Sequence, residues 1–235
     1  MTRRTDLLHA VPALRSCSED TLNRLSRSGQ LCRLKAREIL FHQGAAEEGI
    51  YLQLSGRSLL YTVTQMGQRR VFEIIDAGML LNPTGLTEPS AFAHCEMLQR
   101  SELLCIPREV FLDCACQDGA LNRAVLLAHR RCLCHMEQQI RNCVSSLSGV
   151  YRMASLLRDL AEEFGVERRG GLEIDLELNV SLLGDFLGIP RESASRHRKA
   201  LVQSGLVSVQ GKRITILNPE RLEAFLKNET HSSGL

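Results

Sequence analysis

The sequence contains no long apolar run, and this absence bears on where the chain acts. No stretch approaches the roughly 20 apolar residues that a helix needs to cross a bilayer. The opening segment Met1–His9 is too polar for a signal peptide. We therefore expect a cytoplasmic protein that makes no membrane contact. Its 44% apolar and 24% charged residues are ordinary for a globular protein, and 235 residues suffice for one large domain or two modest ones.

The sequence also lacks a catalytic signature and a large net charge. It contains no recognisable nucleophile motif, phosphate-binding loop or paired carboxylates in a catalytic setting, so we do not expect an enzyme. The formal net charge is only +2, but the basic residues are unevenly distributed. Between 191 and 213 a single acid, Glu192, stands among six cations: Arg191, Arg196, Arg198, Lys199, Lys212 and Arg213. A positive surface of this kind releases counterions from phosphate, which favours binding to a nucleic acid.

The basic segment coincides with a helix-turn-helix pattern. Val180–Leu187 places apolar residues at helical spacing, a tight turn begins at Gly188, and a second helix is predicted up to Gly205. In this second helix we expect Ala194, Leu201 and Val202 to face inward. The outward face then carries Arg191, Glu192, Ser195, Arg196, Arg198 and Lys199. Arginine pairs with guanine, a carboxylate accepts from cytosine and cations bind phosphate, so this face suits DNA reading.

A glycine-containing hairpin follows the second helix. Leu206–Val209 and Ile214–Leu217 flank Gln210–Arg213, which predicts two short strands joined by a tight turn. Beside a helix-turn-helix such a hairpin is a wing, with Lys212 and Arg213 at its tip. Pro219–Leu226 predicts a short closing helix, and the last residues have the composition of a frayed polar tail.

The first half of the chain shows a different pattern. Leu7 to about Ser28 is helical in spacing, with Ser18–Asp20 as a polar start. From Leu31 to Ile106, short apolar runs are broken by glycines, which supply the positive φ of tight turns, so we expect an antiparallel β-roll. Pro107 then opens a helix. The expected strands lie within 38–44, 50–56, 58–64, 71–75, 93–98 and 102–106.

A long amphipathic helix is predicted from Ala120 to Ser148. Leucine or isoleucine recurs every seven residues, and a second position follows three residues later, so that the two positions form one stripe, the seam, along the helix. The seam consists of Leu126, His129, Leu133, Met136, Ile140, Cys143 and Leu147. Such a pattern predicts pairing with another helix, most simply that of a second copy. A two-fold dimer suits a pseudo-palindromic DNA site with half-sites one helical turn apart. After this helix the sequence predicts a break at Gly149, a helix at 151–164, a loop near 168–171 and two short alternating segments in 172–178.

The order of these parts resembles the CRP/FNR superfamily of bacterial transcription regulators. Gly188–Arg196 and Gln203–Ile216 carry the most specific likeness, and the order of parts matches over nearly the whole chain. The resemblance implies an α+β fold with three segments. These are an antiparallel β-roll sensor of the cyclic-nucleotide-binding type (1–119), a dimerisation helix (120–149) and a winged helix-turn-helix (150–235). It also implies a homodimer that binds double-stranded DNA and contacts RNA polymerase.

The spacing of Glu192, Ser195 and Arg196 is similar to that of the FNR branch, whose members bind TTGAT-like half-sites. By this resemblance, Glu192 and Arg196 would read the central G·C pair. Ser195 would contact a neighbouring thymine. The expected function is therefore a DNA-binding transcription regulator that recognises a TTGAT-like palindrome.

The family's cyclic-AMP site is not matched. Its cyclic-AMP binders carry a Gly-Glu-Leu turn and a later Arg-Ser that hold the phosphate. This chain has Gly78–Leu86 and Ala91–His94 there, without that glutamate or arginine. Residues near Met136 and Glu137 replace the Thr-Ser that meets the adenine. A phosphate buried without its cation is costly, so we do not expect cyclic AMP as the effector.

Nine cysteines raise the question of metal or redox sensing. The iron-sulfur branch of the family has three closely spaced N-terminal cysteines and one later cysteine. This chain has only Cys17 and Cys32 near its start, with Cys105 one residue off the later position, so we do not expect that cluster. The chain has two Cys-x-Cys pairs, Cys114/Cys116 and Cys132/Cys134. On a helix the two cysteines of each pair point about 200° apart, so neither pair chelates an ion alone. His129, Cys132 and His135 share a helical face and would suit a metal with help from another segment.

Several alternatives remain open for the sensor. The cysteines are either buried inert thiols, metal or iron-sulfur ligands, or redox thiols. Cys143 would form an intersubunit disulfide if the two Cα atoms come within about 7 Å, or would simply pack in the seam. His94 and Cys95, on a strand expected to line the ligand cavity, would suit haem or an ordinary polar role. The sequence requires no cofactor and identifies no effector, so the alternative function is a cysteine-redox, metal, iron-sulfur or haem sensor that controls DNA binding.

Overall fold

The computed structural model describes residues 7–9, 11–47, 49–88, 90–144 and 148–232, apart from the side chains of 138–139, 141–144 and 229–232. The chain divides into two compact units. The first contains 1–62 and 71–137, and the second contains 63–70 and 138–235. In the described residues no helix is long and apolar enough to span a membrane.

The first unit is the expected antiparallel β-roll. Its two four-stranded sheets have the orders β1-β8-β3-β6 and β2-β7-β4-β5. The strands are β1 (Gln30–Leu34), β2 (Ile39–Phe41), β3 (Gly49–Ser55), β4 (Ser58–Val63), β5 (Arg69–Ile75), β6 (Leu80–Leu81), β7 (His94–Met97) and β8 (Ser101–Pro107). Glycine is required at Gly56, where φ is +79° and an added Cβ would lie 2.3 Å from Ser101 Oγ.

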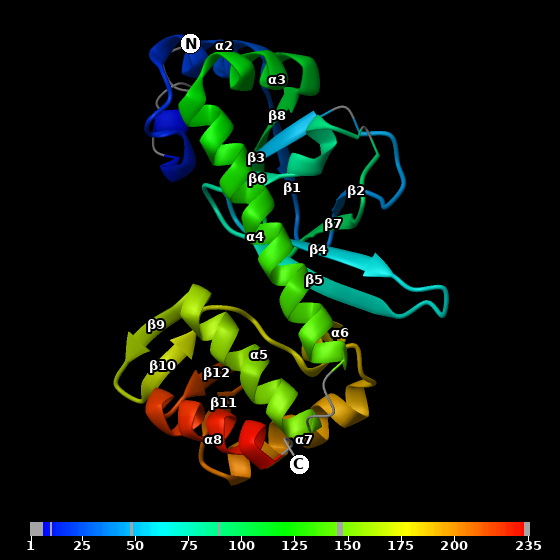
Figure 1. The fold of residues 1–235 in the computed structure, drawn as a ribbon, viewed down its shortest axis with the longest axis vertical. Coiled ribbons are helices and arrows are strands. Elements are labelled where there is room, and N and C mark those ends of the chain that lie inside the picture. The colour runs from blue at the N-terminus through cyan, green and yellow to red at the C-terminus, as the bar shows by residue number, and fades with distance from the viewer. Residues whose placement is uncertain (1–6, 10, 48, 89, 145–147, 233–235) are drawn as a thin grey trace. The chain divides into compact units, whose positions relative to one another are not determined.

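Helices precede and follow the roll along the chain, and the short helix η2 lies between β6 and β7. They are η1 (Pro12–Leu14), α2 (Glu19–Ser28), η2 (Pro83–Leu86), α3 (Arg108–Gln117) and α4 (Gly119–Val144). Ser18 caps α2 because its Oγ accepts from the Thr21 amide, and Pro107 stands immediately before α3 as predicted. Figure 1 shows the part of α4 that belongs to the first unit running past both sheets of the roll.

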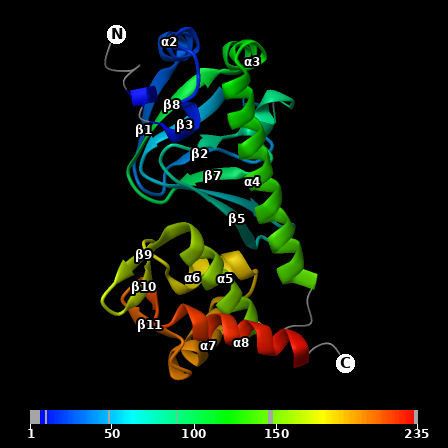
Figure 2. The same cartoon turned by 60° about the vertical axis from the view of Figure 1, so that its left-hand side comes forward.

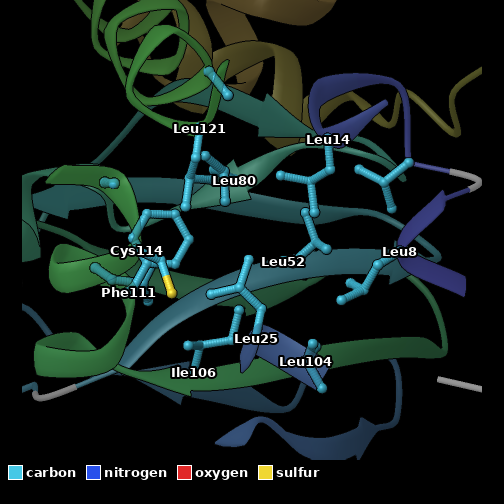
Figure 3. Packing of buried hydrophobic residues seen from close by; sticks show 14 of the residues in the cluster. Leu8, Leu14, Leu25, Leu52, Leu80, Leu104, Ile106, Phe111, Cys114 and Leu121 are labelled. Carbon is cyan, nitrogen blue, oxygen red and sulfur yellow. The ribbon is translucent and has the colours of Figure 1, made fainter. Parts of the chain in front are cut away.

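Two apolar clusters form the core of the first unit. In one, side chains from α2, α3 and α4 pack against β3 and β8, and Figure 3 shows Phe111, Leu121, Leu52 and Ile106 among its members. The other fills the opposite part of the roll with residues such as Leu60, Ile75 and Met97. Burying these side chains supplies the main driving force for folding of the roll.

Beyond the end of α4, the described residues of the second unit form four helices and a small sheet of order β11-β12-β10-β9. Its elements are α5 (Gly149–Phe164), β9 (Gly165–Arg168), β10 (Gly171–Ile174), α6 (Val180–Leu187), α7 (Arg191–Gln203), β11 (Val207–Gln210), β12 (Arg213–Ile216) and α8 (Pro219–Ser232). Figure 2 shows the four helices grouped beside the strands. Helix α5 packs against α6, α7 and α8, so it is the central element of this unit.

Four local expectations require correction. Gly149 begins α5 instead of ending the long helix, because Ser148 accepts from the Tyr151 amide as an N-cap. Residues 165–168 form a strand paired with 171–174, and no strand covers 175–178. The closing helix continues to Ser232. The long helix is described as far as Val144, and 145–147 lie outside the described residues.

Candidate DNA-binding face and sensor

The helix-turn-helix is built by capping residues that stop and restart the chain. Asn179 caps α6 by accepting from the Leu182 amide at 2.9 Å. Gly188 ends α6 in the left-handed conformation with φ +62°. An added Cβ at Gly184 would lie 2.8 Å from the Ile189 carbonyl oxygen, so the turn passes close to the α6 backbone. The predicted helix, turn and helix are therefore confirmed.

Helix α7 presents a polar face to solvent and an apolar face to the core. Ala194 and Leu201 are fully buried, as predicted, but Val202 is 42% exposed. At 100° per residue, Val202 lies 20° from the exposed Arg191 and 80° from the buried Ala194, so it stands at the edge of the buried face and its assignment to the inner face was wrong. The sequence-predicted face has Arg191, Glu192, Arg196 and Lys199 exposed, and Ser195 and Arg198 half-buried.

Arg196 is partly oriented by its own helix. Its Nη2 donates to Ser193 Oγ at 3.1 Å, one turn earlier. Glu192 and Arg196 are four residues apart and therefore lie on neighbouring turns of one face. An acceptor and a forked donor side by side match the edge of a C·G base pair.

The wing is confirmed, but it is less positive than the residues 191–213 alone indicated, because its two cations pair with acids from outside that range. Gln210 pairs with Arg213, and Gly211, with φ +63°, allows the two-residue turn between them. Lys212 Nζ lies 2.8 Å from Glu177 Oε2, and Arg213 Nη1 lies 2.9 Å from Glu173 Oε1. Because these acids precede the helix-turn-helix in sequence, a count over 191–213 misses them. The wing cations are thus partly neutralised by the protein itself.

The start of α5 is tied to both helices of the helix-turn-helix. Arg152 Nη2 donates to the Leu187 carbonyl at 2.6 Å. Gly149 lies under His197, since an added Cβ would come within 2.2 Å of His197 Nε2. Burial, with Arg196 and Arg152 nearby, lowers the pKa of His197 below its ordinary value. Sequence reasoning missed this junction because its members lie 35 or more residues apart.

Helix α4 leaves an apolar stripe exposed. Leu126 is 63% exposed, Leu133 66% and Ile140 61%, and Met136 is also exposed. His129 is half-buried and its Nδ1 lies 3.0 Å from the Val125 carbonyl oxygen. The side chain of Cys143 and all of Leu147 lie outside the described residues. Large apolar side chains at heptad positions on a solvent-facing surface are typical of a helix that pairs with another.

The Cys-x-Cys pairs point to opposite sides, as the helical rotation requires. Cys114 and Cys132 are buried, whereas Cys116 and Cys134 are exposed. Burial raises the pKa of Cys132 to about 11, with Glu73 adding to the effect, and raises that of Cys114. Burial likewise raises the pKa of Cys95 to about 12. Reactive redox thiols have a lowered pKa, so these three resemble inert core residues.

The structure does not bring the candidate metal ligands together. The described side chains contain no group of three or more His, Cys, Asp or Glu residues that could hold a metal ion. Within the face formed by His129, Cys132 and His135, Cys132 is buried while His135 approaches Glu73. In β7, Cys95 is buried in the core and His94 points to the other face, as alternation in a strand requires. His94 and Cys95 therefore cannot both face one haem iron.

A buried ion pair that sequence reasoning missed joins β5 to α4. Glu73 is 4% exposed, and its Oε1 lies 2.7 Å from Arg131 Nε and 3.6 Å from His135 Nδ1. Arg131 also contacts the Met79 sulfur through Nη1. A pocket of about 610 Å³ next to this cluster is lined mainly by small and apolar residues of η1, 78–80 and α4, with Arg123 and Arg131 as its cations.

Asn82 lies within Gly78–Leu86, the segment that stands where the family's cyclic-AMP binders hold the phosphate. Its backbone is left-handed with φ +55°, and its Nδ2 donates to the Gly49 carbonyl at 3.1 Å. An added Cβ at Gly85 would lie 2.4 Å from Asn82 Nδ2. The buried Asn82 side chain therefore fills the space that this turn encloses.

Comparison with known proteins agrees with this architecture. A family model described as the cyclic nucleotide-binding domain matches residues 31–118, and one described as the Crp-like helix-turn-helix domain matches 151–225. The transcriptional activator protein Anr of Pseudomonas protegens is 24% identical over 88% of this chain and 83% of its own length. The fumarate and nitrate reduction regulatory protein of Vibrio cholerae is 26% identical over 78% and 73%.

A solved structure has the same fold. A CooA variant from Carboxydothermus hydrogenoformans superposes with a TM-score of 0.78 over 94% of this chain and 95% of its own, at 18% identity. At that identity the likeness concerns the fold alone. The two matched domains, their order and the regulator relatives together lead to one conclusion. The chain belongs to the CRP/FNR superfamily and is a DNA-binding transcription regulator, not an enzyme.

Proposed function

We propose that the protein is a homodimer that binds a pseudo-palindrome of TTGAT-like half-sites through α7. The observation that carries this proposal is the outward face of α7, where Glu192, Arg196 and Lys199 are exposed above the buried Ala194 and Leu201. In this proposal residues 1–119 receive the signal, 120–149 form the dimer and 150–235 bind DNA. The family resemblance further suggests a cytoplasmic protein that contacts RNA polymerase.

The proposed reading mechanism assigns separate roles to neighbouring residues. Arg196 donates to guanine, Glu192 accepts from cytosine and Ser195 contacts thymine at the central base pairs. Arg191, Arg198 and Lys199 bind phosphates and position the helix in the major groove. Lys212 and Arg213 on the wing add attraction that Glu177 and Glu173 moderate. The wing therefore contributes less to DNA affinity than its two cations alone would.

The proposed signal acts through the arrangement of two α7 helices. Only one arrangement of a dimer places both helices in successive major grooves, and a signal that favours this arrangement increases DNA binding. We do not assign cyclic AMP to the roll. Asn82 fills the turn near the phosphate position, and Arg131 and His135 of α4 both approach the buried carboxylate of Glu73.

Base reading is tested by fluorescence anisotropy with a TTGAT palindrome and with duplexes altered at the central G·C pair. Arg196→Ala should cost about 1 to 3 kcal/mol on the matched site and reduce discrimination at that pair. Lys199→Ala should weaken binding to all sequences alike and lower the salt slope by about one phosphate contact. Arg15→Ala, an exposed arginine of the first unit, is the matched control for charge. Unchanged affinity and selectivity in Arg196→Ala would refute the assignment.

The homodimer is tested by sedimentation of the whole chain. Leu133→Glu places a charge in the exposed stripe of α4, and the variant should sediment as a monomer. Met66→Glu alters an apolar side chain that is 87% exposed in the β4–β5 turn, and this variant should remain a dimer. A dimeric Leu133→Glu variant, or a monomeric wild type, would contradict the proposed seam.

A further inference from the structure

Two histidines face each other across neighbouring strands of the roll. Strands β2 and β7 are antiparallel and pair Phe41 with Cys95, and His42, the residue after β2, contacts His94 of β7. Directly opposed residues of such strands have Cβ atoms about 4.5 to 5.5 Å apart. The two Nδ1 atoms lie 3.3 Å apart, with the rings nearly perpendicular at 88°. His42 is exposed and His94 is half-buried, so solvent reaches the pair.

The surroundings hold both rings in place. Tyr61 of β4 pairs with His94 and stacks on its ring, with centroids 4.9 Å apart and planes inclined by 16°. The Gln43 amide also donates to His94 Nδ1 at 3.4 Å. Beyond His42, the chain is anchored where the Gly44 amide donates to the Ala91 carbonyl at 2.7 Å. Strands β2, β7 and β4 lie side by side in one sheet, with His94 on β7, Tyr61 on β4 and His42 directly after β2 (Figure 1).

The separation of the two nitrogens matches a bidentate metal site. Two imidazole nitrogens bound at 2.0 to 2.1 Å to a tetrahedral ion are about 3.3 Å apart. In the metal-free pair, His94 Nδ1 accepts from Gln43, so the proton between the rings belongs to His42 Nδ1. Metal binding moves that proton to Nε2 of the same ring and displaces the long 3.4 Å bond from the Gln43 amide to His94 Nδ1, so both imidazoles stay neutral and both Nδ1 lone pairs bind the ion.

We propose that His42 and His94 form a binding site for a divalent first-row transition ion such as Zn²⁺ or Ni²⁺. Imidazole suits these ions, and a pre-positioned pair avoids most of the ordering cost of chelation. The described side chains supply no third His, Cys, Asp or Glu here, so water completes the coordination. The proposed site uses no cysteine and no residue of α7, and it adds metal binding to the proposed DNA regulator.

The test is a calorimetric titration of the reduced full chain with Ni²⁺. Wild type should bind one Ni²⁺ per chain, and His42→Gln and His94→Gln should each weaken that binding at least tenfold. His9→Gln removes a surface histidine of the same unit that lies 3.2 Å from Glu19, and it should bind as wild type does. Because His42 is exposed, the His42→Gln variant is expected to fold normally, and circular dichroism checks this for each variant.

A second measurement separates imidazole from thiol ligands. Co²⁺ bound by the histidine pair should give only weak visible bands, whereas bound thiolates add an intense near-ultraviolet charge-transfer band. Wild-type Ni²⁺ affinity in a folded His42→Gln variant would overturn the proposal. A thiolate band that accounts for the bound Co²⁺, or no binding at millimolar Ni²⁺, would overturn it equally.

Discussion

Arg152, in the first turn of α5, donates from Nη2 to the carbonyl of Leu187, the last residue of α6, at 2.6 Å. The last carbonyls of a helix have no partner within the helix, so this bond caps α6 with a charged donor. It also links the segment that follows the long helix directly to the helix-turn-helix. A change in the direction of α5 therefore acts on α6 without passing through solvent.

We predict that Arg152→Ala destabilises the second unit by about 1 to 3 kcal/mol, because a buried carbonyl loses a charged donor. Hydrogen exchange of peptides from 180–187 measures this loss in the unit concerned. Arg169→Ala, an exposed arginine in the β9–β10 turn, should leave the exchange unchanged. Equal exchange in both variants would show that Arg152 does not hold α6.

The lowered pKa of His197 predicts a pH dependence of stability. Burial, Arg196 and Arg152 disfavour the protonated ring in the folded state, while in the unfolded chain histidine titrates near pH 6.5. The unfolded state thus binds more protons between those two pKa values. The stabilisation is fully present above about pH 6.5, falls as the pH drops below it, and is lost below the folded pKa.

Replacement of His197 should therefore flatten part of this profile. We expect the unfolding midpoint of wild type to fall more steeply between pH 7.5 and 5 than that of His197→Gln. His9→Gln, a surface histidine of the first unit, should keep the wild-type slope in the second unit. Urea unfolding at several pH values, followed by exchange of α7 peptides, measures both slopes. Identical slopes in wild type and His197→Gln would exclude His197 as the titrating group.

Features set by neighbouring residues could be predicted from the sequence. The turn at Gly188 and the wing turn at Gly211 each depend on a few consecutive residues, and both are confirmed. The polar start predicted at Ser18–Asp20 coincides with the beginning of α2. The glycine-broken apolar runs predicted the roll for the same reason. Val202 was misassigned because its apolar character was taken as a sign of burial, although its helical position is next to that of the exposed Arg191.

Features that depend on sheet register or on distant packing could not be predicted. Glu73 meets Arg131 across 58 residues, and His42 meets His94 across 52. Which side chains meet across such distances depends on strand pairing and on the rotation of α4, and neither leaves a local signal in the sequence. The acids that pair with the wing were missed for the same reason, since Glu173 and Glu177 precede α6.

Thiol labelling distinguishes inert from reactive cysteines. With a pKa of about 11, Cys132 carries only roughly three thiolates in ten thousand at pH 7.5, and its burial also blocks access. We predict that iodoacetamide labels the exposed Cys116 quickly and Cys132, Cys114 and Cys95 slowly, as measured by peptide mass spectrometry. In guanidinium all nine cysteines should react. Rapid labelling of native Cys132, or DNA affinity reversed by a thiol reductant, would favour the redox alternative.

The buried pair of Glu73 and Arg131 predicts an asymmetric response to mutation. Arg131→Met leaves a carboxylate that is 4% exposed without its main cation, and His135 at 3.6 Å replaces it only in part. We expect a loss of about 3 kcal/mol in the first unit, the lower end for a broken buried pair because Arg131 keeps some solvent contact. Glu73→Leu in the same chain removes the stranded charge and should restore most of that stability.

Hydrogen exchange of peptides from 71–75 measures the stability of β5 directly in the full chain. Arg123→Met changes an exposed arginine two turns earlier on α4 and serves as the control for helix propensity and charge. Two results would contradict the prediction. One is equal exchange in Arg131→Met and Arg123→Met. The other is a double variant no more stable than Arg131→Met, because an unpaired carboxylate would then not be the cause of the loss.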